Sequence, residues 1–215
     1  MERIITSLRT VKLTKDIRRA LVTMERRDPK EANLSNHLLE LYREEWIGAE
    51  QYIYMETRLL LNRFCLATER LFPDSDVTMG VYFFDAGTKR LWVGAGPNAP
   101  ASYNEYANGL SAIPDIVSDG TPEYTKTVLP VNDVDSCEHF VSLNHRRDLL
   151  KAGIRAFCSV PLVHDGRVIG HVNMYSARPK VWSPAESRLI ESQAAGVERR
   201  LLDVKERFVR AAAAL

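Results

Sequence analysis

Apolar and polar side chains alternate along several short stretches in the second half of the chain, a pattern typical of β-strands. The clearest pair is residues 156–163 and 168–177, joined by His-Asp-Gly-Arg. Asp-Gly between two such stretches predicts a tight hairpin turn. Three further strands are expected at residues 77–84, 90–95 and 127–131. Short helices are expected between them, so the pattern predicts an antiparallel sheet in an α+β fold.

The first part of the chain lacks this alternation and is expected to be helical. A short helix is predicted at residues 14–26, and Asp28-Pro29 ends it. A second helix is predicted to run unbroken from Ser35 to Phe72. Apolar residues recur along it at steps of seven, namely Leu39, Trp46, Ile53, Leu60 and Ala67. This spacing predicts a helix that packs lengthwise on another helix.

A long C-terminal helix is predicted from Ala185, because Ser-Pro precedes it and Glu186 lies in its first turn. Its apolar residues also repeat every seven positions, at Ile190, Val197 and Val204 and at Ala194, Leu201 and Phe208. Two interpretations stay open: this stripe covers one face of the sheet, or it forms a coiled coil with a second copy. We predict a homodimer with an interface made by Leu39, Trp46, Ile53, Leu60, Ile190, Val197, Leu201, Val204 and Phe208.

Two units are therefore predicted. Residues 1–72 form an N-terminal helical region, and residues 73–210 form an α+β domain with about five to six strands flanked by helices. The last residues, 211–215, read Ala-Ala-Ala-Ala-Leu and resemble a scar left by a cloning vector; a natural Ala-rich helix end is the alternative. A scar would mean that an output domain beyond Arg210 has been removed.

The net charge, the number of cysteines and the lengths of the apolar runs limit which partners and which cellular location are expected. The formal net charge of +1 gives no overall field that would attract nucleic acid or a membrane surface, so neither partner is expected. The 3 cysteines are an odd number and lie far apart, which argues against a disulfide framework and for a reducing compartment. No apolar run has the length of a membrane span, and no signal-peptide core follows the first residues. The expected location is the cytoplasm.

The amino-acid sequence of the hairpin region resembles that of a known protein family. Residues 159–162 read Ser-Val-Pro-Leu, and residues 166–175 follow the pattern GxVIGxVxxY. This ending resembles GAF domains, and the similarity extends over about residues 51–207. The resemblance implies a sensory module that binds a small molecule and passes the event along a helix to a covalently linked output domain.

Specialised GAF subgroups fit less well. The resemblance to cyclic-nucleotide-binding members is incomplete, because Met174 follows Asn173 where those members carry Lys. Bilin-binding members place Cys beside His, and no such pair occurs here. Free-methionine-sulfoxide reductases are the enzymatic branch; Cys137 and Cys158 could lie near a pocket, but the surrounding motifs differ. We therefore expect no enzyme, and the cofactor and the ligand stay unidentified.

Candidate ligand-binding residues come from the last predicted strand and from aromatic residues around the pocket that the GAF resemblance implies; the alternative is that His171 and Tyr175 bond to helix carbonyls and only shape the core. His171, Asn173 and Tyr175 alternate and so share one face of the last strand. The full set of pocket candidates is Phe83, Trp92, Tyr103, Tyr106, Tyr124, Cys158, His171, Asn173 and Tyr175. The alternative is a dimerisation module whose pocket is plugged by Phe83, Trp92 and Tyr175. No metal site is expected, because Cys137, His139 and His145 fit no usual zinc spacing, and their helix is expected to be solvated.

Overall fold

The computed structural model describes residues 33–72, 76–110, 127–138 and 143–214. Its strands form one antiparallel sheet in the order β2-β1-β5-β4-β3, which confirms the predicted α+β class. The strands are β1 (Val77–Asp85), β2 (Arg90–Ala95), β3 (Leu129–Val131), β4 (Ala156–His164) and β5 (Arg167–Ser176). The helices are α2 (Asn33–Arg43), α3 (Ala49–Glu69), α4 (Ala101–Ala107), α5 (Leu143–Lys151) and α6 (Pro184–Ala214). The helix expected at residues 14–26 lies outside the described residues.

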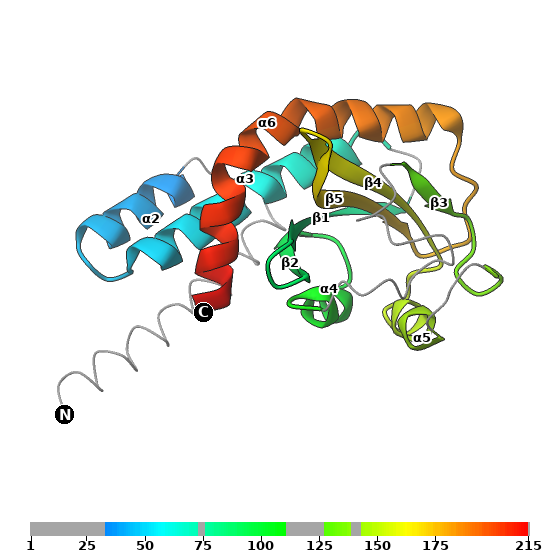
Figure 1. The fold of residues 1–215 in the computed structure, drawn as a ribbon, viewed down its shortest axis with the longest axis horizontal. Coiled ribbons are helices and arrows are strands. Elements are labelled where there is room, and N and C mark those ends of the chain that lie inside the picture. Colours follow the sequence, from blue (N-terminus) through cyan, green and yellow to red (C-terminus); the bar gives the residue numbers. More distant parts are fainter. Residues whose placement is uncertain (1–32, 73–75, 111–126, 139–142, 215) are drawn as a thin grey trace.

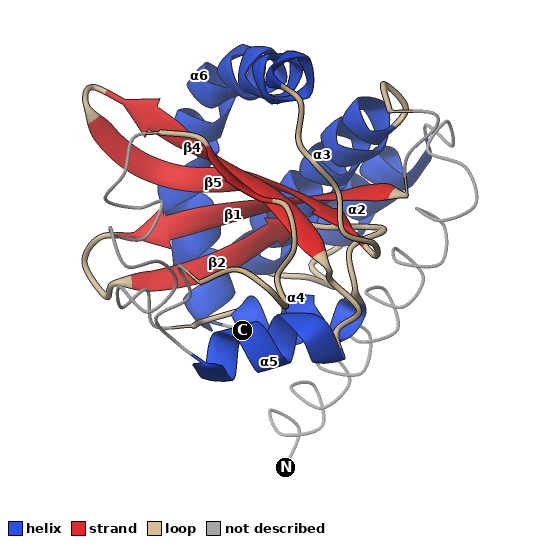
Figure 2. Ribbon diagram, turned by 90° about the vertical axis from the view of Figure 1, so that its right-hand side faces the viewer, coloured by secondary structure: helices blue, strands red, loops and turns tan. Residues whose placement is uncertain are grey.

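Helices cover both faces of the sheet. Figure 1 shows α3 and α6 above it and the short helices α4 and α5 below it. The sheet is seen between these two layers in Figure 2, with β5 at its centre between β1 and β4. The α3/α6 face contains the larger apolar core, whereas the α4/α5 face contains a smaller core rich in tyrosine. The two faces therefore differ in chemistry.

The β4–β5 hairpin forms where the sequence predicts it. Asp165 and Gly166 both have positive φ angles, of 47° and 70°, as a two-residue hairpin turn with the right twist requires. Glycine adopts this conformation without strain, and aspartate tolerates it better than most residues. The turn thereby sets the register in which the two strands pair.

The start of α6 also agrees with the sequence. The hydroxyl of Ser183 accepts a hydrogen bond from the backbone N–H of Glu186 at 3.2 Å. The Glu186 carboxylate in turn accepts one from the backbone N–H of Ser183 at 2.9 Å. This reciprocal pair is a capping box, and Pro184 supplies the preset φ of the first helical turn. Lys180 holds the same carboxylate at 2.7 Å, which fixes how α6 leaves the sheet.

The prediction of one unbroken helix from Ser35 to Phe72 is wrong. The chain instead turns between α2 and α3, where Glu45 has a φ of 59° and Gly48 precedes α3. The side chain of Gln51 accepts a hydrogen bond from the Gly48 N–H at 2.8 Å. Ile47 within the turn is buried in the core, so burial of this side chain offsets the loss of helical hydrogen bonds. The repeat from Leu39 to Ala67 therefore does not lie on one helix.

The four described members of the α6 stripe lie inside their own chain. Ile190, Ala194, Leu201 and Phe208 are all buried in the core that α6 shares with α3 and the sheet. The side chains of Val197 and Val204 lie outside the described residues. The interpretation in which the stripe covers the sheet is thus the one that the structure supports. The predicted use of Ile190, Leu201 and Phe208 in a dimer interface is wrong for this arrangement, because these side chains are already covered.

Phe208 is the main anchor of the far half of α6. Its ring stacks on Tyr54 of α3 with centroids 5.2 Å apart and tilts against Phe83 of β1 at 5.1 Å. We expect Phe208→Ala to lower the free energy of unfolding by about 3 to 5 kcal/mol, as large buried aromatic truncations do. The neighbouring exposed substitution Arg207→Ala should change it by less than about 0.5 kcal/mol. Urea unfolding of both variants measures the difference, and equal stabilities would contradict the packing of α6 described here.

Candidate functional site

A set of polar side chains lies under the centre of the sheet, on the α4/α5 face. Tyr82 of β1 pairs directly with His171 of β5, so both point to this face. Asn173 and Tyr175 follow His171 at steps of two and share its side. The alternation predicted for His171, Asn173 and Tyr175 therefore describes one wall of a single site.

All of these side chains except His171 belong to a continuous hydrogen-bond chain. The Asn173 amide donates to the Tyr175 hydroxyl at 3.0 Å, and Tyr175 donates to the Tyr82 hydroxyl at 2.9 Å. Tyr82 donates to Oδ1 of Asn104 on α4 at 3.1 Å, and Nδ2 of Asn104 donates to the Gly96 carbonyl at 3.0 Å. The chain links α4 to β1 and β5. It therefore positions four side chains from three elements relative to one another.

Two glycines leave the space that this chain needs. A Cβ at Gly80 would lie 2.7 Å from the Tyr82 hydroxyl, and one at Gly96 would lie 2.8 Å from Nδ2 of Asn104. Both distances are too short for a real contact. The ring of Tyr82 can lean along β1 toward Tyr175 only because residue 80 carries no side chain.

Aromatic rings enclose the site from α4 and α5. Tyr103 meets Tyr175 edge-on at 5.5 Å between centroids, and it meets His145 edge-on at 6.1 Å. Tyr106 lies 6.0 Å from the same imidazole. His145 is buried, so the expectation of a fully solvated α5 is wrong at this position. The helix turns His145 toward the tyrosines, while Arg147 stays exposed.

His171 has no hydrogen-bond partner. Its side chain is only 4% exposed, and neither ring nitrogen is bonded. Burial lowers the pKa of His171 from its ordinary value to about 4, so the imidazole is neutral at physiological pH. Oδ1 of Asn173 is also buried and unpaired. Buried polar groups without partners are rare in proteins and are expected to meet water or a ligand.

The site has no described charged side chain among its close partners. Burial raises the pKa values of Tyr82, Tyr103 and Tyr175 well above their ordinary range, so all three stay protonated and can donate hydrogen bonds. Their electrostatic partners in the described part of the chain are other tyrosines, asparagine and cysteine. Within these same residues, no three His, Cys, Asp or Glu side chains gather closely enough to hold a metal ion.

Three predicted pocket residues lie on the other face of the sheet. Phe83 and Trp92 are paired across β1 and β2 and pack with the α3/α6 core, as does Cys158. One site therefore cannot include them together with Tyr175, and the predicted plug of Phe83, Trp92 and Tyr175 is not formed. Burial raises the pKa of the Cys158 thiol to about 11, which leaves it protonated and a poor nucleophile at neutral pH. Tyr124 lies outside the described residues.

Sequence analysis missed three members of the site. Tyr82 precedes the chosen Phe83 by one position, and only the pairing of β1 with β5 shows which of the two faces His171. Asn104 is a polar residue on a short helix, where a solvent-facing role is the ordinary expectation. His145 was assigned to a solvated helix. A signal for Tyr82 does exist in the sequence, since Gly80 stands two positions before it on the same face of the strand.

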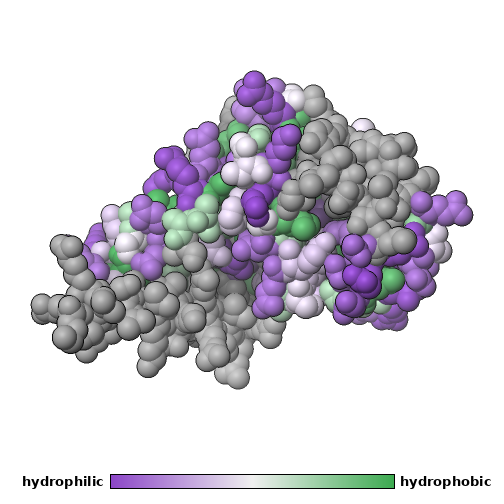
Figure 3. Space-filling model, turned by 60° about the horizontal axis from the view of Figure 1, so that its bottom comes forward, coloured by the Kyte–Doolittle hydropathy of each residue, from purple (hydrophilic) through white to green (hydrophobic). Residues whose placement is uncertain are grey.

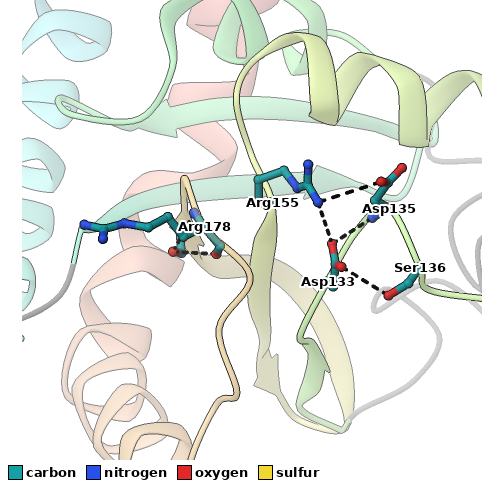
Figure 4. Close-up of polar contacts among 6 residues, drawn as sticks. Asp133, Asp135, Ser136, Arg155 and Arg178 are labelled. Carbon is teal, nitrogen blue, oxygen red and sulfur yellow. Dashed lines mark hydrogen bonds and ion pairs between the residues drawn. The ribbon is translucent and has the colours of Figure 1, made fainter.

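A polar network closes the end of the sheet beside the site. The Arg155 guanidinium lies 3.4 Å from Asp133 and 3.7 Å from Asp135, and Asp133 also accepts a hydrogen bond from Ser136 (Figure 4). The backbone N–H of Asp135 and these neighbours hold the pKa of the Asp133 carboxyl below its ordinary value. The network fixes the loop after β3 to the start of β4. Because its charged groups are partly exposed and already paired with one another, we assign this network a structural role beside the site and no role in binding.

The outer surface on this side gives little sign of the tyrosine cluster. Where described residues are visible in Figure 3, they are mostly hydrophilic, with small separate hydrophobic areas. A groove of about 180 Å³ lies on the opposite side, between β4 and α6, with Pro161 and Leu162 on one wall and Glu191 and Glu198 on the other. Neither glutamate has a buried side-chain atom without a partner, whereas His171 and Asn173 do, so the α4/α5 face is the stronger candidate site.

The buried neutral state of His171 predicts a pH dependence. The folded protein binds a proton at His171 only near pH 4, whereas the unfolded chain binds it near the ordinary pKa of 6.5. Proton uptake therefore favours unfolding as the pH falls below about 6.5, and the loss should reach about 2 kcal/mol by about pH 5. Thermal unfolding from about pH 7 to about pH 5 should show this loss, and His171→Gln should remove that part of it.

The exposed His164 offers a matched control. His164→Gln makes the same exchange of imidazole for amide at the surface, where His164 is 41% exposed, and it should change stability at about pH 7 by less than about 1 kcal/mol. If wild type and His171→Gln lose stability in parallel, then His171 is not the buried neutral group described here.

Comparisons with known proteins place this geometry in a family. The sequence model of the GAF domain family matches residues 60–201. The structure resembles a domain assigned to a two-component sensor histidine kinase protein from Sinorhizobium meliloti 1021, at 19% identity and a TM-score of 0.55, over 70% of this chain and 94% of that one. It also resembles the GAF domain/HD domain protein from Geobacter sulfurreducens, at 20% identity and a TM-score of 0.54, over 67% of this chain and 91% of that one.

A third solved structure with a similar fold comes from a cyanobacteriochrome. The GAF domain of the cyanobacteriochrome TePixJ is 16% identical with a TM-score of 0.51, over 66% of this chain and 86% of that one. At these identities the likeness shows the fold alone. The comparison with curated proteins found no match.

Neither α6 nor any other helix in the described residues combines the length and apolarity that crossing a membrane demands. Because the family match covers well over half of the chain, and the sheet, the hairpin and the flanking helices agree with it, this chain belongs to the GAF domain family.

Proposed function

We propose that this GAF domain is a sensory module that binds a small molecule between the sheet and the α4/α5 layer. The observation that carries the proposal is His171, a buried imidazole without any hydrogen-bond partner. A side chain that only shaped the core would be expected to bond its neighbours, since leaving a buried polar group unpaired costs about 1 to 3 kcal/mol. A bound molecule that bonds His171 and Asn173 would remove that cost.

The transmission step runs through β1 to α6. Tyr82 faces the proposed site, and the next residue, Phe83, faces the helices and contacts Phe208. A ligand that shifts Tyr82 would thereby move Phe83 against α6. Such a ligand changes the output only if it binds one arrangement of β1 and α6 more tightly than another. The output domain is expected beyond α6.

A homodimer remains part of the proposal, with a revised interface. On α3, Leu60 is 43% exposed and Ala67 is exposed, while Ile53 is half-buried one repeat earlier. Trp46 in the turn before α3 is 56% exposed. This outward stripe supports pairing through α3, since Ile190, Leu201 and Phe208 of α6 are already covered. The cytoplasm is the proposed location, supported by three cysteines that are all free.

Ligand binding can be tested without knowing the ligand. Native mass spectrometry of the purified protein should show an added mass that leaves when the sample is denatured. His171→Leu should lose this added mass, because it removes both unpaired nitrogens from the site. Trp92→Phe, on the opposite face of the sheet, should keep it. An unmodified mass in every sample, together with unaltered melting in the presence of a broad metabolite library, would contradict the sensory proposal.

The interface can be tested with two leucines of opposite burial. Leu60→Asp should convert the dimer to a monomer in sedimentation experiments while it changes unfolding by less than about 0.5 kcal/mol, because the side chain is exposed. Leu201→Asp should instead unfold the domain, because it places a charge in the core where Leu201 is 1% exposed. A Leu60→Asp protein that still sediments as a dimer would remove α3 from the interface.

A further inference from the structure

The hydrogen-bond chain under the sheet has a fixed direction. It starts at the Gly96 carbonyl, which can only accept, so Asn104 must turn its Nδ2 toward it and its Oδ1 toward Tyr82. Tyr82 then has to donate to Asn104, and its own oxygen is left to accept from Tyr175. The single hydroxyl hydrogen of Tyr175 is used in that bond.

This direction determines how the amide of Asn173 is oriented. The Tyr175 oxygen has only acceptor capacity left, so the Asn173 group that meets it must be the donor Nδ2. A flipped amide would place two acceptors against each other. Oδ1 of Asn173 is therefore directed away from the chain, and it is the buried atom that has no partner.

His171 adds two more unpaired positions. A neutral imidazole carries one N–H donor and one nitrogen acceptor, and both are without partners here. Residues two apart on one face of a strand lie about 7 Å from each other. The site thus presents an acceptor from Asn173 and both a donor and an acceptor from His171, on residues whose Cα atoms are about 7 Å apart.

The surroundings favour an uncharged molecule. Besides His171, the titratable side chains that contact one another at this site in the described residues of β1, β5, α4 and α5 include Tyr82, Tyr175, Tyr103, Tyr106 and His145. None of these five is an acid or a strong base, and the hydrogen-bond and electrostatic partners of Tyr82, Tyr103 and Tyr175 in the described part of the chain include no Lys or Arg that could neutralise a buried anion. An unpaired charge in such surroundings would carry a large desolvation cost.

We propose that the ligand is an uncharged planar nitrogen heterocycle with a ring N–H and a ring nitrogen acceptor in 1,3 relation. The ring N–H donates to Oδ1 of Asn173, and the ring nitrogen accepts from the N–H of His171. Two such bonds on a small ring span about the separation of the two side chains. The rings of Tyr103 and Tyr175 supply the aromatic surface against which a flat molecule packs. This inference rests on the proposed sensory function and specifies the ligand of that site.

Three probes of nearly identical shape test the hydrogen-bond pattern. Benzimidazole has both ring groups, indole has the N–H alone, and benzofuran has no donor; benzoate serves as an anionic probe. Binding to the full chain is measured at neutral pH by ligand-observed NMR titration. We expect benzimidazole to bind at least about tenfold more tightly than benzofuran, with indole between them, as the loss of one or two buried hydrogen bonds implies. Benzofuran or benzoate binding as tightly as benzimidazole would overturn the inference.

Two variants test whether the chain sets the direction of the Asn173 amide. Tyr175→Phe removes the acceptor that holds Nδ2, so the amide can turn its N–H groups toward the ligand, and the preference for indole, which carries only a donor, over benzofuran should be lost. Asn104→Ala releases the other end of the chain and should have the same effect if Tyr175→Phe does not fold. Tyr42→Phe, an exposed tyrosine on α2, should keep the full preference.

The outcomes separate this inference from the function on which it rests. A preference that survives both variants would overturn the role of the chain. A co-purified anionic molecule, or a haem recognised by its absorbance, would support a sensory site and overturn the uncharged heterocycle. No bound probe together with no co-purified mass would overturn both proposals.

Discussion

The hydrogen-bond chain from the Gly96 carbonyl to the Asn173 amide is the constraint on which the candidate site depends. It lies in a buried layer between the sheet and the short helices, where a polar group without a partner is costly. Gly80 and Gly96 exist as glycines at the two points where a Cβ would collide with the chain. The chain joins α4 to the central strands, so the arrangement of Tyr82 and Tyr175 and the unpaired Oδ1 of Asn173 follow from it.

The second constraint is the alternation of side chains along β1. Neighbouring residues of a strand point to opposite faces, so Tyr82 belongs to the polar layer and Phe83 to the apolar one. Phe83 contacts Phe208, which also stacks on α3. β1 therefore contacts the proposed ligand site with one face and α6 with the other. This gives a short physical path from ligand binding to the exit helix. The tight packing of the apolar core favours discrete shifts over gradual ones.

Much of this fold could be predicted from the sequence because its signals are local. Asp165-Gly166 specifies a hairpin, and Ser183-Pro184 followed by Glu186 specifies where α6 begins. The turn before α3 was missed because the repeat of seven continues across it from Leu39 to Ile53, and only the burial of Ile47 shows why the chain bends there. A repeat of seven cannot tell whether a helix faces its own sheet or a second copy. On α6 it faces the sheet.

The site itself was only partly predictable, because its membership depends on strand register. Alternation within β5 was sufficient to group His171, Asn173 and Tyr175. Placing β1 and β2 required the pairing with β5, which shows that Phe83 and Trp92 face the other layer. The contribution of Asn104 depends on a contact with a backbone carbonyl, which leaves no trace in residue type or spacing.

Ligand binding at the α4/α5 face should change the packing of α6 on the other side of the sheet. Hydrogen exchange of the backbone amides, followed by mass spectrometry with and without saturating benzimidazole, measures this most directly. In the wild-type protein, the account predicts that benzimidazole slows amide exchange in α4 and β5 and changes it in α6 around Phe208. In the Phe208→Ala protein, benzimidazole should leave amide exchange at that end of α6 unchanged. Slower exchange confined to α4 and β5, with α6 unaffected in the wild-type protein, would contradict it.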